Sequence, residues 1–210
     1  MEEIKDSYLT IESDAEAIFK EKSSKFLCYA FHVESEEEIA AHLEILRKRY
    51  YDATHHCYAW RLGPFGEKFR ANDDGEPSGS SGRPVLGQID SFGLSDILVV
   101  VVRYFGGTLL GTGGLVRAYT QAVQEGIKNC ETAMMRFGVR YKLSTDYNGV
   151  GKILYLLSEQ GITQESADYG ENVELQVMVP VEWTEKLVKD ITEATGGRTG
   201  ITEIERTYFI

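Results

Sequence analysis

Residues 97–119 have the sequence ILVVVVRYFGGTLLGTGGLVRAY, and this stretch decides the fold. Residues 97–104 include four consecutive valines, which predicts a strand buried on both faces in the middle of a sheet. The glycine-rich residues 105–114 predict a loop, and the residues after it predict a helix from Leu115 to about Lys128. Its expected buried residues are Leu115, Ala118, Ala122 and Ile127. This succession indicates a layered protein with helices packed on a sheet.

The residues before this stretch predict further strands and two helices. Strands are expected at residues 8–11, 17–31, 54–62 and 68–71. Ser35 and Glu38 have the spacing of a capping box, and Ile39, Leu43 and Leu46 follow it as one apolar stripe. A short helix is expected from Pro84 through Ile89, because proline suits the first turn of a helix.

The residues after Cys130 predict a second domain. Strands are expected at residues 136–145, 162–169, 173–179 and 201–209, and helices at residues 150–159 and 183–195. The order β-α-β-β-α-β is that of the ferredoxin-like unit. We therefore expect an α+β chain with an N-terminal domain over residues 1–133 and a ferredoxin-like domain over residues 134–210.

Composition and charge narrow the classes of function. The net charge is −11, which disfavours generic binding to nucleic acid through phosphate neutralisation. Residues 51–130 are nearly balanced, with 8 acidic and 7 basic side chains, so an anion-binding surface is expected there. No apolar run approaches the ~20 residues of a membrane span, and no secretory leader precedes the first strand. Three widely spaced cysteines indicate a reducing compartment, so we expect a cytoplasmic protein without a membrane partner.

Ten of the 21 glycines lie between Gly75 and Gly114, in and around two loops. These glycines could simply allow tight connections around a sheet, or they could allow a ligand to approach the main chain. In the second interpretation the two loops meet, and N–H groups near Gly113 and Gly114, before the helix that follows the second loop, hold an anion. The candidate binding residues are Arg70, Asp73, Asp74, Glu76, Ser78, Gly79, Arg83, Arg103, Gly106, Gly107, Gly113, Gly114 and Arg117.

Two clusters of titratable residues allow other interpretations. Asp73, Asp74 and Glu76 could bind Mg²⁺ or a basic partner, or could accept hydrogen bonds from loop N–H groups. His55 and His56 are secondary candidates for the binding site. His55 and Cys57 share one face of a strand, and they could form a catalytic pair or only pack. We predict no metal site and no nucleotide cofactor, since neither a P-loop nor a dinucleotide fingerprint is present.

Three motifs resemble those of the Impact N-terminal domain. They are residues 73–84 (DDGEPSGSSGRP), residues 103–107 (RYFGG) with residues 110–119 (LGTGGLVRAY), and residues 53–59 (ATHHCYA). Residues 80–81 are Ser-Ser where this family usually has Thr-Ala, which moves one hydroxyl group within the loop. The residues from Tyr141 onward resemble the small C-terminal domain of bacterial YigZ-like members.

The resemblance implies a fold and a range of functions. The N-terminal domain would be similar to the second domain of ribosomal protein S-five, and the C-terminal domain to domain V of elongation factor G. Eukaryotic relatives regulate translation, and a nucleic-acid or ribosome role is suspected for bacterial ones. We therefore expect a binding protein that contacts RNA, the ribosome or a translation-regulatory protein through the two loops, with the ferredoxin-like sheet as a second surface. A hydrolase using Asp73, Asp74, Glu76 and His55 is the alternative, and a purely structural scaffold is a third hypothesis.

Overall fold

The structure is a computed structural model that describes residues 4–210. Its elements, in chain order, are β1 (Ser7–Ile11), β2 (Ala15–Glu21), β3 (Ser24–His32), α1 (Glu36–Arg49), β4 (His55–Leu62), β5 (Lys68–Asn72), α2 (Gly82–Ser91), β6 (Ile97–Tyr104), α3 (Gly111–Lys128), β7 (Thr132–Thr145), α4 (Tyr147–Glu159), β8 (Gln164–Tyr169), β9 (Val173–Pro180), η1 (Val181–Trp183), α5 (Thr184–Thr195) and β10 (Gly200–Phe209). The chain divides into a first unit, Tyr8–Met134, and a second unit made of residues 135–210 with residues 4–7.

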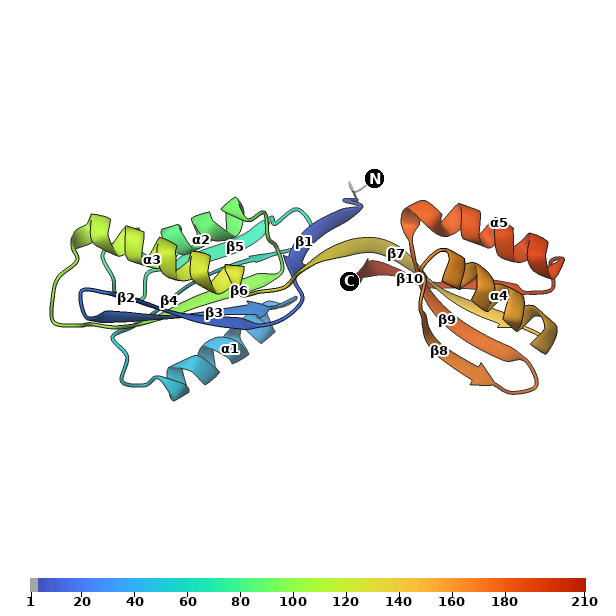
Figure 1. Ribbon diagram of the computed structural model, residues 1–210, viewed down its shortest axis with the longest axis horizontal. Helices are drawn as coiled ribbons and strands as arrows, with labels where there is room; N and C mark the ends of the chain where they lie inside the picture. Colours follow the sequence, from blue (N-terminus) through green and yellow to red (C-terminus); the bar gives the residue numbers. More distant parts are fainter. Residues whose placement is uncertain (1–3) are drawn as a thin grey trace. The chain divides into compact units, whose positions relative to one another are not determined.

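The first unit is built around β6, as the valine run predicts. Its antiparallel sheet has the order β2-β3-β6-β4-β5, and residues 97–103 of β6 are all buried. Helices α2 and α3 cover one face of the sheet and α1 covers the other (Figure 1). Each face therefore has its own hydrophobic core, which explains why β6 is apolar from Ile97 to Val102.

Helix α1 forms where its capping box predicts. Ser35 Oγ accepts a hydrogen bond from the Glu38 N–H at 3.2 Å, and the Glu38 carboxylate accepts from the Glu34 N–H at 2.8 Å. The predicted stripe of Ile39, Leu43 and Leu46 is buried against the sheet. The local sequence thus sets both where this helix begins and which side packs.

Several predicted bounds differ from the structure by a few residues, and two of the differences bear on the glycine-rich loops. Residues 17–31 do not form one strand, because Lys22 and Ser23 adopt φ values of +44° and +66° and turn the chain back between β2 and β3. Two central turn residues with positive φ are usually Asn-Gly or a similar pair, so Lys-Ser gave no turn signal. Helix α3 begins at Gly111 rather than at Leu115. Glycine disfavours helices, so the sequence pattern hides this first turn.

The second unit has the expected β-α-β-β-α-β order from β7 to β10. Its strands pair antiparallel in the order β10-β7-β9-β8. Helices α4 and α5 pack on one face of this sheet, with Ile153, Leu157, Leu187 and Ile191 in the core. The α+β class expected from the sequence is confirmed. Of the helices formed by residues 4–210, none is long and apolar enough to span a membrane.

Candidate functional site

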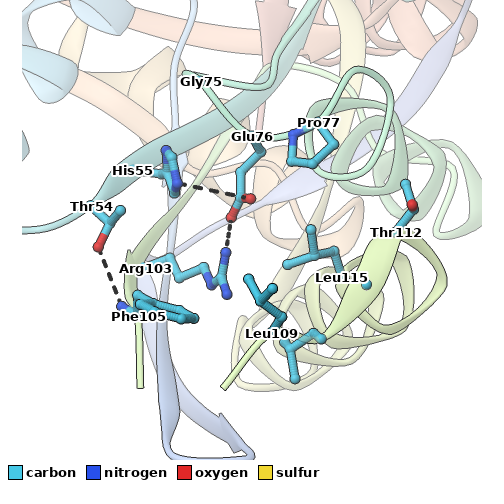
Figure 2. Close-up of a pocket in the computed structure, with 12 residues that line it drawn as sticks. Thr54, His55, Gly75, Glu76, Pro77, Arg103, Phe105, Leu109, Thr112 and Leu115 are labelled. Carbon is cyan, nitrogen blue, oxygen red and sulfur yellow. Dashed lines mark hydrogen bonds and ion pairs between the residues drawn. The ribbon is translucent and has the colours of Figure 1, made fainter. Parts of the chain in front are cut away.

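The two glycine-rich loops meet in one pocket of the first unit. The pocket has a volume of about 440 Å³ and is lined by Thr54, His55, Gly75, Glu76, Pro77, Arg103, Phe105, Leu109, Leu110, Gly111, Thr112 and Leu115. Figure 2 shows His55, Glu76 and Arg103 together at its polar end, with the apolar side chains facing them. Segments about 30 residues apart in sequence therefore form one concave site, which is typical of ligand-binding pockets.

A buried ion pair forms the floor of this pocket. Arg103 Nη1 donates to Glu76 Oε1 at 2.5 Å, and the side chains of these two residues are only 6% and 3% exposed. The hydroxyl group of Tyr119, from α3, donates to the same carboxylate oxygen at 2.9 Å. These contacts connect the first loop to β6 and to α3, so they hold the pocket's three segments together.

Arg103 keeps donor capacity beyond this ion pair. Its Nε atom is buried and has no hydrogen-bond partner among residues 4–210. The guanidinium group lies 5.4 Å from the centre of the Phe26 ring and 5.7 Å from that of Phe105. Stacking between aromatic faces holds the group in place without using its N–H donors.

His55 is fixed by the first loop. Its Nδ1 atom lies 2.8 Å from the carbonyl oxygen of Asp74. A carbonyl oxygen can only accept, so Nδ1 donates and Nε2 points toward Glu76 Oε2, 3.8 Å away. The backbone of Asp74 adopts a φ of +43°, and Gly75 follows with +86°, so this loop conformation presents the carbonyl to the imidazole.

The Asp73 carboxylate organises the first loop. It accepts hydrogen bonds from the N–H groups of Gly79, Ser81 and Gly82 and from the hydroxyl group of Ser81, at 2.8–3.0 Å. Burial disfavours the charged form, but these hydrogen bonds outweigh it and lower the pKa of Asp73 below its ordinary value. The Asp74 carboxylate accepts from the His56 N–H at 2.7 Å. Asp73 thus binds the main chain of its own loop, and Asp74 attaches the loop to β4.

Cys57 lies beneath the loop and is not set up as a nucleophile. Burial raises the pKa of its thiol to about 12, so the thiol is protonated at neutral pH. Its Sγ donates to the carbonyl oxygen of Asp73 at 3.0 Å and lies 3.2 Å from the Tyr119 hydroxyl. The packing interpretation of Cys57 therefore accounts for its contacts, and a Cys57–His55 catalytic pair does not.

The candidate residues from the sequence separate into two groups. Of these, His55, Glu76 and Arg103 line the pocket. The side chains of Arg70 and Arg83 are exposed on β5 and α2, and Arg117 lines a separate depression of about 300 Å³ with Phe19, Glu21 and Gln121. None of these three arginines forms an ion pair with residues 4–210. The remaining candidates outside the pocket lining are Asp73, Asp74, Ser78, Gly79, Gly106, Gly107, Gly113, Gly114 and His56.

The glycines of the second loop have different roles. The N–H of Gly106 donates to Ser24 Oγ at 3.1 Å, and a Cβ atom at this glycine would lie 2.1 Å from the Ser23 carbonyl carbon. Gly107 and Gly111 have φ values of +84° and +69°. Gly113 lies in the first turn of α3, where a Cβ atom would meet only Arg117 Nη1, at 3.7 Å, and no side chain caps this helix. The open turn leaves main-chain N–H groups beside the pocket.

Sequence reasoning missed the apolar wall and the buried tyrosine. Leu109 is 84% exposed and Phe105 is 46% exposed, although both are large apolar residues. Their position among glycines, outside any helical or strand pattern, was a signal that could have identified them. Tyr119 follows Leu115 by four residues on the buried side of α3, so helical spacing could have placed it in the core. Within residues 4–210, no group of His, Cys, Asp and Glu side chains could hold a metal ion.

Comparison with known proteins places this architecture in a family. The model of the Impact N-terminal domain matches residues 22–127, and a family described as a domain of unknown function (DUF1949) matches residues 143–198. The IMPACT family member YvyE of Bacillus subtilis (strain 168) is 36% identical over 202 residues, which cover 96% of this chain and 93% of that protein. This chain belongs to the IMPACT family.

Other members of the IMPACT family match over different lengths. YigZ of Escherichia coli (strain K12) is 33% identical over 88% of this chain and 91% of its own length. A Protein IMPACT homolog of Dictyostelium discoideum is 39% identical, but over only 43% of this chain and 27% of its own length. A solved structure titled as that of a hypothetical protein has a TM-score of 0.65 and 32% identity, and covers 96% of this chain and 99% of that one.

Proposed function

We propose that this chain is a non-catalytic binding protein connected with translation, which contacts RNA or the ribosome through the pocket between the two loops. The observation that carries the proposal is the joint pocket, which is lined both by the buried Arg103, whose Nε is unpartnered among residues 4–210, and by Gly111 and Thr112 at the uncapped start of α3. Guanidinium and helix N-terminal N–H groups favour phosphate and other anionic groups. The connection with translation rests on the resemblance to the IMPACT regulators.

The charge balance of the chain agrees with binding at a pocket better than binding along a basic surface. The net charge is −11, and the exposed Arg70, Arg83 and Arg117 are not gathered in the pocket. The other partner that could supply an anionic group to this pocket is a translation-regulatory protein, through one of its acidic side chains. We place the chain in the cytoplasm, in agreement with its three free cysteines.

The test changes the first turn of α3 and leaves the ion pair intact. Removing Arg103 would leave the buried Glu76 charge unpaired, at a cost of about 3–5 kcal/mol, and would confuse binding with folding. For Gly113→Asp, a Cβ atom at Gly113 meets only Arg117 Nη1, at 3.7 Å, and a carboxylate in the first turn stabilises a helix. The same carboxylate would repel an anion that approaches the first turn of α3. Gly87→Asp in α2 is the control, since Gly87 is exposed, a Cβ atom there meets nothing within 4 Å, and Gly87 lies outside the pocket.

We expect wild type and Gly87→Asp to co-sediment with ribosomes, or to retain RNA on a filter, at low salt. Gly113→Asp should bind at least tenfold more weakly while its thermal unfolding midpoint stays the same or rises. Equal retention of all three proteins would show that the loops are not the contact surface. If wild type retains neither ribosomes nor RNA, the RNA proposal is wrong and a protein partner replaces it.

One observation supports the hydrolase alternative. His55 is held by a main-chain carbonyl so that its Nε2 faces Glu76 in the pocket, which is an arrangement that general bases use. The carboxylates of Asp73 and Asp74 are bonded to main-chain N–H groups of the loop and of β4, so His55 and Glu76 would have to act without them. A screen with ester, peptide and phosphate-ester substrates tests this alternative. Hydrolysis that is lost in a folded His55→Phe variant would replace the binding proposal.

A further inference from the structure

The polar end of the pocket presents acceptors next to donors. With the ring hydrogen of His55 on Nδ1, its Nε2 accepts, and Glu76 Oε2 also accepts. At 3.8 Å these two atoms are too far apart for a direct hydrogen bond. They are close enough for one amino group, which has two hydrogens, to donate to both.

The donors come from Arg103 and from α3. Arg103 is 5% exposed, its Nη1 is engaged by Glu76, and its Nε is unpartnered in the described chain. Figure 2 shows its guanidinium group extending from β6 between Glu76 and Leu109. A ligand that donates to the His55–Glu76 pair therefore also meets a donor at Arg103, which requires an acceptor next to the ligand's amino group.

The walls of the pocket suit a flat, largely apolar ligand. The polar end is surrounded by the apolar residues Pro77, Phe105, Leu109, Leu110 and Leu115. Of these, Phe105 is 46% exposed. The volume of about 440 Å³ admits one nucleoside-sized group but no duplex. Aromatic side chains stack on bases of single-stranded nucleic acids.

We propose that this pocket binds one base of single-stranded RNA, and that it selects adenine and cytosine over guanine and uracil; this rests on the proposed function. Adenine and cytosine each have an exocyclic amino group beside a ring nitrogen that accepts. The amino group donates to His55 Nε2 and Glu76 Oε2, and the ring nitrogen accepts from Arg103. Guanine and uracil differ at the pairing edge of the base. There the ring nitrogen next to the exocyclic oxygen carries a hydrogen, which would face the Arg103 donors. The adjacent phosphate lies at the first turn of α3.

The test uses the four 5′-mononucleotides, with ribose 5-phosphate as the probe that lacks a base. All five carry the same phosphate group, so differences among them report the base. Binding to the isotope-labelled full chain is followed by NMR, at the amides of Gly111, Thr112 and Gly113 and at the His55 ring. AMP and CMP should bind about tenfold more tightly than GMP and UMP, and ribose 5-phosphate should bind most weakly.

Two variants with a matched control assign the binding to the pocket. Phe105→Leu should weaken AMP and CMP binding about fivefold or more. Phe65→Leu should leave it unchanged, because Phe65 is 47% exposed in the β4–β5 turn and does not line the pocket. His55→Phe removes an acceptor and should reduce the preference for AMP and CMP to about twofold or less, with GMP and UMP binding unchanged.

Four results would overturn the inference. Equal binding of all nucleotides and ribose 5-phosphate would show a site for the anion alone. Unchanged AMP binding in Phe105→Leu would place the base elsewhere. The wild type could bind no nucleotide and still retain ribosomes or RNA in a way that Gly113→Asp weakens. That result would reject the base pocket but leave the proposed function in place. If the protein binds no nucleotide and also retains neither RNA nor ribosomes, the base pocket and the proposed function are both rejected.

Discussion

Three buried or half-buried residues hold the segments that form the pocket: Asp73, Glu76 and Arg103. The Asp73 carboxylate accepts four hydrogen bonds from its own loop, and Glu76 holds Arg103 and Tyr119. Each of these side chains has internal partners, and each makes a different segment rigid. The acidic residues of the loop therefore position the binding surface, and the atoms left over on Glu76, His55 and Arg103 are the groups that a ligand would meet.

The Asp73 contribution to stability should depend on pH. Because the folded pKa lies below the ordinary aspartate value of 3.8, this contribution is complete above that value and is lost as pH falls through the folded pKa. Asp73→Asn should lower the free energy of unfolding by about 1–3 kcal/mol at pH 7, since buried N–H groups lose charged acceptors. The difference from wild type should shrink between about pH 4 and pH 2 in urea unfolding measurements.

Asp74→Asn is the neighbouring control for this prediction. Asp74 accepts one main-chain hydrogen bond, from His56, and asparagine tolerates its φ of +43°. At pH 7, Asp74→Asn should lower the free energy of unfolding by less than half as much as Asp73→Asn does. Equal losses, or a loss in Asp73→Asn that persists unchanged at pH 2, would contradict the role assigned to the Asp73 carboxylate.

At the scale of elements, the second loop is fixed by its contact with the β2–β3 turn. Gly106 lies against Ser23 and Ser24, and this approach leaves no room for a side chain. The turn exists because Lys22 and Ser23 take positive φ values. The direction in which the loop leaves β6, and hence the place where α3 begins, follows from this contact.

Gly106→Ala should therefore destabilise the first unit. Its Cβ atom would lie 2.1 Å from the Ser23 carbonyl carbon, and moving the main chain to relieve such an overlap costs about 1–3 kcal/mol. Gly113→Ala should change stability by less, from no effect to about 1 kcal/mol of stabilisation, because Gly113 is helical and a Cβ atom there meets only Arg117 Nη1, at an ordinary contact distance of 3.7 Å. Chemical unfolding of both variants measures this. A neutral Gly106→Ala would show that the loop is not held at the turn.

At the scale of the whole molecule, charge is distributed differently on the two units. The sheet of the second unit carries paired charges: Arg140 contacts Glu165 and Glu205, and Lys142 lies 2.8 Å from Glu174. Cations that are paired in this way give little net attraction for phosphate. The pocket of the first unit is then the better candidate for RNA contact than the ferredoxin-like sheet that the sequence also suggested.

RNA binding should consequently depend weakly on salt. Binding through one or two phosphates to single strands predicts a slope of log K against log salt concentration of about −0.7 to −1.4. Lys142→Ala should change neither the affinity nor this slope in fluorescence anisotropy titrations at several salt concentrations. A slope steeper than about −3, or clear weakening in Lys142→Ala, would move the contact to a broader charged surface.

The sequence by itself determined the features that depend on neighbouring residues. The valine run identified β6, Ser35 and Glu38 identified the start of α1, and alternating elements gave the β-α-β-β-α-β order of the second unit. Periodicity, capping and turn chemistry act over a few residues, so they can be recognised in one segment. The three motifs also indicated the family that the comparisons confirm.

Only the tertiary structure decided what the two loops form. It paired Glu76 with Arg103, 27 residues away, brought Tyr119 beneath them, and surrounded them with Leu109 and Phe105. It also left Arg83 and Arg117 outside the pocket, although they lie close in sequence to the loops. The physical reason is that burial and hydrogen bonding between distant segments depend on how the sheet and helices pack, and no local pattern encodes that packing.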